Sequence, residues 1–170
     1  VVLPYGISGS YYLFFFTDTA TTEIYTNNNQ GSSLAVPVTL SPSADLLVEE
    51  ITLPATAQEG ALIDISWTVI NQGQAQTDGI WSDSVVLVPA SGTGSTINLG
   101  SFRYDRTLEP GIRYTRTEQV RLPAKIEGLY RIRVIANADK GIYEHGAARD
   151  NNSLTSVTTT EVSLNPRPDL

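Results

Sequence analysis

The sequence predicts an all-β protein: an immunoglobulin-like β-sandwich of about seven strands, one complete unit preceded by the tail of another. Three observations lead to this prediction. Apolar residues alternate with period two along residues 45–164, turn residues interrupt that alternation at intervals suited to strands, and no convincing helical pattern is present. The hydrophobic content of 41% in 170 residues is enough for a packed core.

The expected strands follow one another with short turns between them. They span residues 46–53, 62–71, 80–88, 96–103, 113–122, 128–137 and 154–164, separated by turn sequences such as NQGQ, PASGTGS, LEPG and NADKG. In the second strand, Trp67 lies on the same side as Ile65 and Val69. We therefore expect Trp67 at the centre of the core, facing the strand at 128–137. The alternative is a functional Trp67 in a cleft.

Two internal matches predict a tandem arrangement. VVLPYGISGSYYL at the start of the chain shares six identities with VRLPAKIEGLYRI, 119 positions later, and residues 27–46 share eight of 20 positions with residues 151–170. We expect residues 1–40 to be the C-terminal part of a preceding repeat and 41–44 a linker. Residues 45–164 would be a complete repeat, and 165–170 a linker with the start of a following one. The prolines of SPSAD and NPRPD favour stiff, extended linkers.

The stretch FFFTDTATTEIYT interrupts the match between the repeats. Its residues 18–26, DTATTEIYT, resemble the translation of a common sequencing-library adapter, while a natural loop is the alternative interpretation. We assign no function to Asp18 or Glu23. Because the chain starts at Val1 and contains no Met, we expect it to be a piece of a longer protein.

Several motifs in a fixed order resemble a known family. The runs SWTVINQG, WSDSVVLV, LEPGIRYT, LPAKIEGLYRIRVIANAD and DNNS resemble the CARDB family, bacterial domains related to cell adhesion that occur in tandem on extracellular proteins. The resemblance covers nearly all of residues 45–164. It implies an immunoglobulin-like sandwich, a secreted or surface location and no catalysis by the domain itself.

Composition limits the classes of partner. A net charge of −7 with 11 scattered basic residues argues against nucleic-acid and anionic-membrane binding, and no apolar run is long enough to enter a membrane. The absence of Cys excludes disulfides and thiolate metal sites. The expected partners are neighbouring repeats of the same chain and, beyond them, surface glycans or proteins.

One loop is a candidate calcium site. Asp139, Glu144, Asp150 and Asn152 lie close together in the sequence, and Ca²⁺ prefers several carboxylate and carbonyl oxygens from a flexible segment. The spacing of an EF-hand loop is missing. In the alternative interpretation, the Asn side chains bind the loop's own backbone. His145, the only histidine, is expected in a solvated loop, and no other cofactor is predicted.

Three aromatic residues form the second candidate site. Trp81, Tyr104 and Tyr114 would be a platform for sugar stacking if they were exposed, whereas packing at the strand ends is the alternative. The sequence thus predicts a non-enzymatic adhesion and spacer module. A carbohydrate-binding module, or an accessory domain of a large secreted enzyme whose catalytic part lies elsewhere, are the alternatives.

Overall fold

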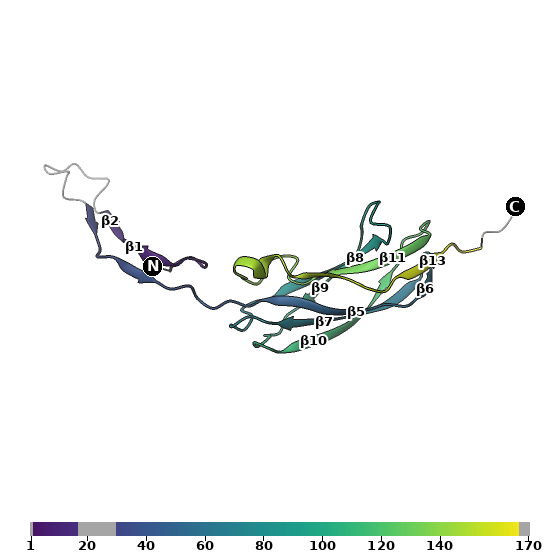
Figure 1. Cartoon of the computed structure of the whole chain (residues 1–170), viewed down its shortest axis with the longest axis horizontal. Coiled ribbons are helices and arrows are strands. Elements are labelled where there is room, and N and C mark those ends of the chain that lie inside the picture. Colours follow the sequence, from purple (N-terminus) through teal and green to yellow (C-terminus); the bar gives the residue numbers. More distant parts are fainter. Residues whose placement is uncertain (1, 17–29, 167–170) are drawn as a thin grey trace. The chain divides into compact units, whose positions relative to one another are not determined.

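The computed structural model describes residues 2–16 and 30–166, which fall into two compact units, Val1–Ser41 and Pro42–Leu170 (Figure 1). Residues 18–26, with their two interpretations, lie outside the described residues. Within the described ranges, no helix has the length and apolarity needed to cross a membrane.

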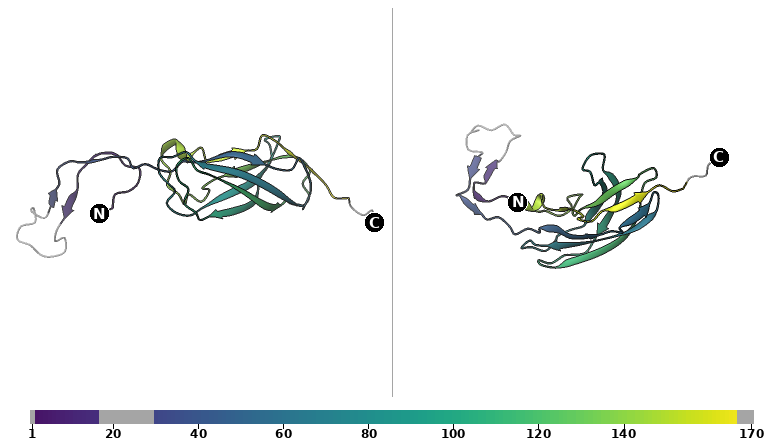
Figure 2. Two further views of the ribbon diagram at one scale, coloured as in Figure 1. Left: turned by 90° about the horizontal axis from the view of Figure 1, so that it is seen from below. Right: turned by 45° about the vertical axis from the view of Figure 1, so that its right-hand side comes forward.

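The second unit is an all-β sandwich of two sheets, as the alternation predicts (Figure 2). Its strands are β5 (Leu46–Thr52), β6 (Thr56–Gln58), β7 (Leu62–Asn71), β8 (Trp81–Pro89), β9 (Ile97–Tyr104), β10 (Arg113–Arg121), β11 (Gly128–Ile135), β12 (Ser153–Thr155) and β13 (Thr160–Ser163). One sheet has the order β10-β7-β5, and the other β6-β13-β11-β8-β9, with β12 also paired to β11. The short 3-10 helix η1 (Gly146–Arg149) precedes β12.

The last predicted strand, 154–164, is two strands rather than one. At Ser156 the chain leaves the ladder, because the Ser156 hydroxyl accepts the backbone N–H of Ile132 at 3.1 Å in place of a main-chain carbonyl. β12 and β13 then pair with different halves of β11. β6 was not predicted from the sequence; its three residues run parallel to β13 after the chain crosses from one sheet to the other.

The core of this unit lies between the two sheets and is centred where the sequence predicts. Trp67 is 1% exposed, and its ring centroid lies 5.4 Å from that of Phe102 in the opposite sheet. Ile132 and Val134 of β11 are fully buried in the same cluster. Because interiors of this kind are close-packed, each large side chain adds a few kcal/mol through burial. The alternative of an exposed Trp67 in a cleft is wrong.

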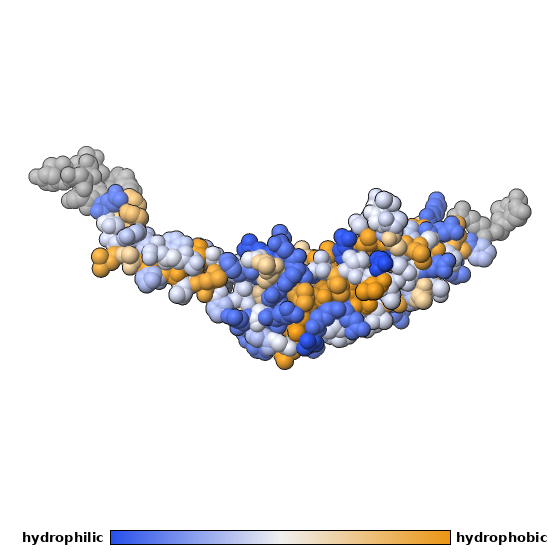
Figure 3. All heavy atoms as spheres, viewed as in Figure 1, coloured by the Kyte–Doolittle hydropathy of each residue, from blue (hydrophilic) through white to orange (hydrophobic). Residues whose placement is uncertain are grey.

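The first unit contains two strand pairs. β1 (Gly9–Tyr11) pairs with β4 (Val36–Val38), and β2 (Phe14–Phe16) pairs with β3 (Gln30–Ser32), both antiparallel. None of the described residues of this unit is buried. Its exposed large apolar side chains are Val2, Leu3, Tyr5, Tyr11, Tyr12, Leu13, Phe14, Phe15, Phe16, Leu34, Val36 and Leu40. Figure 3 shows apolar surface on this unit, at the left.

We predict that Trp67→Ala lowers the free energy of unfolding by about 3–5 kcal/mol, because the cavity left by the indole cannot close fully. Urea unfolding of the full chain measures this change. Val157→Ala is the matched control, since Val157 is 88% exposed and its truncation should change the free energy by less than about 0.5 kcal/mol. Equal effects of the two substitutions would contradict the central role of Trp67.

Candidate functional site

A buried carboxylate links the two sheets at one end of the core. Asp83 on β8 is fully buried, and it accepts hydrogen bonds from the indole of Trp67 at 2.9 Å and from the indole of Trp81 at 3.2 Å. The hydroxyl of Tyr114, on β10, donates to the same carboxylate at 2.5 Å. Because Trp67 and Tyr114 belong to one sheet and Asp83 to the other, this carboxylate connects the sheets directly.

The burial of Asp83 has an electrostatic consequence. Desolvation raises the pKa of the Asp83 carboxyl above its ordinary value, although the three hydrogen bonds and the charge of Arg116 oppose the rise. The pKa of Tyr114 is also raised, first by burial and then by the nearby charge and hydrogen bond of Asp83. Each group therefore holds its proton more strongly than it would in water.

The three aromatic residues of the predicted platform do lie together. Ring centroids of Trp81 and Tyr104 are 4.6 Å apart, and Tyr104 stacks on Tyr114 at 4.1 Å. Trp81, however, is completely buried, so its ring has no face for a sugar, and packing at the strand end is its role. Tyr104 and Tyr114 are half-buried and border a hollow of about 280 Å³. The other residues around it are Arg103, Asp105, Arg106, Thr115 and Arg116.

A second buried carboxylate holds the loop that the sequence suggests as a calcium site. One oxygen of Glu144 accepts the backbone N–H of Leu46 at 2.6 Å, and the other accepts the side-chain amides of Asn137 at 2.8 Å and Asn152 at 2.6 Å. Burial raises the pKa of Glu144, while these hydrogen bonds oppose the rise. Asn137 also binds the backbone of Ile142 in both directions, so Asn side chains do fasten this loop.

The calcium candidates are not arranged as one ligand set. Asp139 is exposed and accepts the backbone N–H of Ser82 at 3.0 Å, and Asp150 is exposed at the end of η1. Only Glu144 and Asn152 touch, and both oxygens of Glu144 face N–H donors, which is the orientation opposite to the one a cation requires. Among the described residues, no group of three acidic or His side chains could hold a metal. His145 is exposed, as expected.

The chain enters the sandwich through a clamped segment. The backbone N–H groups of Gln74 and Ala75 donate to the carbonyl of Ser43 at 3.1 and 3.2 Å, and that of Gln72 donates to the carbonyl of Asp45 at 2.7 Å. A Cβ at Gly73 would lie 2.4 Å from the Ser43 oxygen, so only glycine allows this approach. From the other side, Asn151 donates to the Asp45 side chain at 2.9 Å.

Asn71 completes the entry clamp from inside the sandwich. Its side-chain oxygen accepts the backbone N–H groups of Asp45 at 3.1 Å and Gly73 at 3.0 Å. Its amide donates to the carbonyls of Ala75 and Leu108 at 2.8 and 2.9 Å. Asn71 and Gly73 are therefore turn formers, as the sequence suggests, and they also fix the incoming chain.

The chain leaves the sandwich through a similar clamp. Glu59 is 7% exposed and accepts the backbone N–H groups of Lys125 and Asn165, the latter at 3.1 Å. The side chain of Asn165 donates in turn to the Glu59 carbonyl at 3.1 Å. Thus a buried glutamate anchors the chain at each junction: Glu144 where β5 begins and Glu59 beyond the end of β13.

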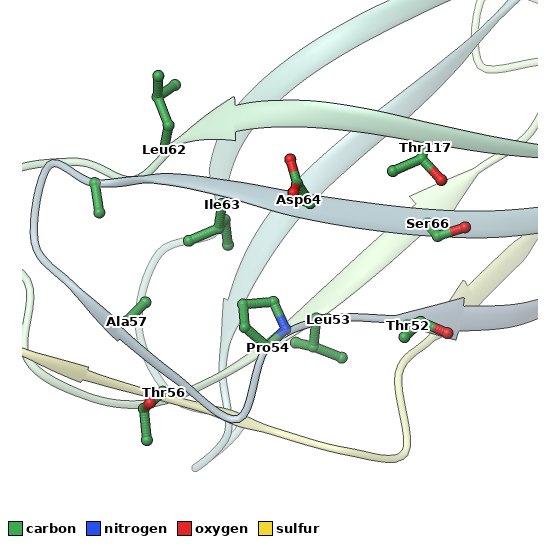
Figure 4. A pocket seen from close by; sticks show the side chains of 11 residues that line it. Thr52, Leu53, Pro54, Thr56, Ala57, Leu62, Ile63, Asp64, Ser66 and Thr117 are labelled. Carbon is green, nitrogen blue, oxygen red and sulfur yellow. The ribbon is translucent and has the colours of Figure 1, made fainter.

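A hollow of about 590 Å³ lies where the chain crosses from β5 to β6 (Figure 4). Leu53 and Pro54 of the crossing and Ile63 of β7 line it, and Asp64 is its only charged residue. A single carboxylate among Thr, Ser and apolar side chains offers no acid and base pair. We therefore interpret this hollow as a consequence of the strand crossing between the sheets.

The roles of Asp83 and Glu59 were not predicted from the sequence. A signal for Asp83 was present, since it shares its side of the β8 pattern with Trp81, Val85 and Leu87, which places a carboxylate toward the core. Glu59 gave no such signal, because it lies in a turn and its partners come from distant parts of the chain.

Comparisons with known proteins agree with the fold. No family model and no curated protein matches the chain. The chain is similar to the CARDB domain of a Pyrococcus furiosus protein, crystallised in complex with di-metal ions, with 23% identity and a TM-score of 0.52 over 75% of this chain and 100% of that domain. The solution NMR structure of that domain gives 22% identity and a TM-score of 0.50 over 72% and 97%. The fold is thus the CARDB fold that the motifs imply.

Calorimetric unfolding of the full chain with excess Ca²⁺ and with EDTA tests the calcium candidate. Because both Glu144 oxygens are engaged by N–H donors, we expect the two melting temperatures to coincide. A rise with Ca²⁺ would demonstrate binding to the native state by linkage and would contradict this expectation. Asp150→Asn would then identify whether the loop is the site.

We predict that Asp83 makes stability depend on pH. A folded-state pKa above the unfolded one adds stability that is fully present below the ordinary pKa of about 3.9 and is lost as pH rises through the folded pKa. Asp83→Asn keeps an acceptor for an indole, and its amide can donate to Tyr114. The difference in unfolding free energy between wild type and Asp83→Asn should therefore fall with rising pH, measured by urea titrations from about pH 4 upward.

The exposed Asp105→Asn is the control for this prediction, because Asp105 lies near the same aromatic residues. A pH dependence that is identical in wild type and Asp83→Asn would show that Asp83 does not titrate differently on folding.

Proposed function

We propose that this chain is a non-catalytic spacer module of a secreted or surface protein, built from tandem units and presenting weak adhesion surfaces. One observation carries the proposal: in the Pro42–Leu170 unit, the chain enters at one end of the sandwich and leaves at the other (Figure 1), and a buried glutamate anchors each junction. Units with this geometry can be joined end to end, so that length grows with copy number.

The anchored strands are suited to carry tension along the unit. β5 is antiparallel to β7, and β13 is antiparallel to β11, so a force on the two junctions runs along both strands. Hydrogen bonds in antiparallel pairs are perpendicular to the strands and are loaded in shear, which requires several to break together. A spacer that keeps its length under load needs this arrangement.

The CARDB fold of the solved neighbours and the proline-containing junctions support the same function. Pro42 and Pro166 stand at equivalent positions of the two internal matches, one before the entry clamp and one after the exit clamp. Proline limits the freedom of such short connections, and many weak contacts along a stiff array add through multivalency. We propose the stacked Tyr104 and Tyr114 beside their hollow as the surface for a sugar partner.

We predict that pulling the full chain from its two ends gives one main force peak from the sandwich. Release of about 120 residues between the two clamps should lengthen the chain by roughly 400 Å, less the folded length. Single-molecule force spectroscopy measures both quantities. Glu144→Ala should lower the peak force or add an early step, since the backbone N–H of Leu46 at the start of β5 loses its acceptor and the loop amides of Asn137 and Asn152 lose theirs.

Glu127→Ala is the matched control, because Glu127 is an exposed glutamate of the same unit. Gradual extension without a peak would contradict the spacer function. An unchanged trace for Glu144→Ala would show that the clamp carries no load.

A further inference from the structure

The two strand pairs of the first unit repeat the pairing of the last strands of the second unit. β1 faces β4 in the register in which the start of β11 faces β13, and β2 faces β3 as the end of β11 faces β12. For β1 and β4, the pair Gly9↔Val38 corresponds to Gly128↔Val162, and Tyr11↔Val36 corresponds to Tyr130↔Thr160. For β2 and β3, the pair Phe14↔Ser32 corresponds to Arg133↔Thr155, and Phe16↔Gln30 corresponds to Ile135↔Ser153.

A side-chain hydrogen bond recurs at the same place. The backbone N–H of Leu13 donates to the Ser33 hydroxyl at 2.9 Å, and the N–H of Ser33 donates to the Leu13 carbonyl at 2.8 Å. Ile132 and Ser156 make the same two bonds at 3.1 and 2.7 Å. Sequence offsets alone would match Ser156 with Ser32, so the bonding pattern corrects the internal alignment by one residue here.

The two units differ in what covers their equivalent side chains. Ile132 and Val134 are fully buried against the opposite sheet. Leu13 and Phe15 occupy the same positions in the first unit, and they are 36% and 56% exposed. A contiguous set of exposed apolar residues on one sheet face marks a surface that another element covers.

We propose that this face of the first unit, formed by Tyr11, Leu13, Phe15 and Val36, is an interface that docks the strands of another copy of residues 42–119. The inference rests on the tandem arrangement proposed above and deepens it by naming the surface and its occupant. The occupant supplies β5, β7 and most of β10 for one sheet and β6, β8 and β9 for the other, together with the cluster of Trp67, Trp81 and Asp83.

The chemistry of residues 42–119 fits this face. In the second unit Ile132 and Val134 of β11, which correspond to Leu13 and Phe15, belong to one core cluster with buried apolar side chains of β5, β7 and β8. Because side chains alternate along a strand, the shared register presents Leu13 and Phe15 to the same neighbours. The outward position between Leu13 and Tyr11 is Tyr12, which corresponds to the outward Arg131 of β11.

The test is a chimera in which residues 42–119 precede Val1 of the full chain, so that Val1 takes the place of Val120. We expect calorimetry to show about twice the unfolding enthalpy of the chain 1–170, because a second core forms. Binding of the hydrophobic dye ANS, which the exposed face of the original chain should cause, should fall toward the background level.

Matched substitutions in the chimera distinguish the proposed docking face from the opposite side of the same strands. Leu13→Asp should abolish the added unfolding enthalpy and restore dye binding, whereas Tyr12→Asp on the outward side should leave both unchanged. Equal behaviour of the two variants, or a chimera with the enthalpy and dye binding of the original chain, would overturn the proposal. A stable dimer of the original chain that binds no dye would also overturn it, since the surface of an already folded second unit, and not unpaired strands of residues 42–119, would then cover the face.

The spacer function and the docking interface can be contradicted independently of each other. The force experiment depends on the Pro42–Leu170 sandwich and its clamps, while the chimera depends on the face of the first unit. A normal force peak together with a failed chimera would retain the spacer and remove the docking interface.

Discussion

The buried carboxylate of Asp83 is the constraint around which the sandwich is organised. Two indoles and a phenol bring three polar hydrogens into an apolar core, where each would be costly without an acceptor. Asp83 accepts all three, and because its partners lie on both sheets, the sheets can approach only in the registry that satisfies it. The apolar side chains supply most of the stabilisation, while this cluster restricts how they pack.

The same solution appears at both junctions of the sandwich. Glu144 accepts N–H groups from the beginning of β5 and from its own loop, and Glu59 accepts N–H groups from the turn before β11 and from the chain beyond β13. Carboxylates suit this role, because two oxygens can satisfy several backbone donors that strand ends leave unpaired. Glu144, in the acidic loop that resembled a cation site, therefore fixes the incoming chain, and both of its oxygens face N–H donors.

The first unit shows how far local pairing extends without a core. Its two strand pairs keep the register and the Ser–backbone bonds of their counterparts, even though none of its described residues is buried. Register depends on local hydrogen bonding and alternation, whereas stability depends on the surface that a second layer removes from water. Correct pairing and an uncovered face can therefore coexist in one segment.

The sequence by itself determined the all-β class, most strand bounds and the central Trp67, because alternation and turns are properties of neighbouring residues. It could not separate β12 from β13 or detect β6. The division between β12 and β13 depends on their pairing with β11, and β6 depends on its pairing with β13. Only the tertiary structure decided that Trp81 is buried, that Asp83 meets Tyr114, and that Glu144 meets Leu46, 98 residues away. Such contacts join strands of different sheets or distant loops, and the alternation of neighbouring residues does not predict them.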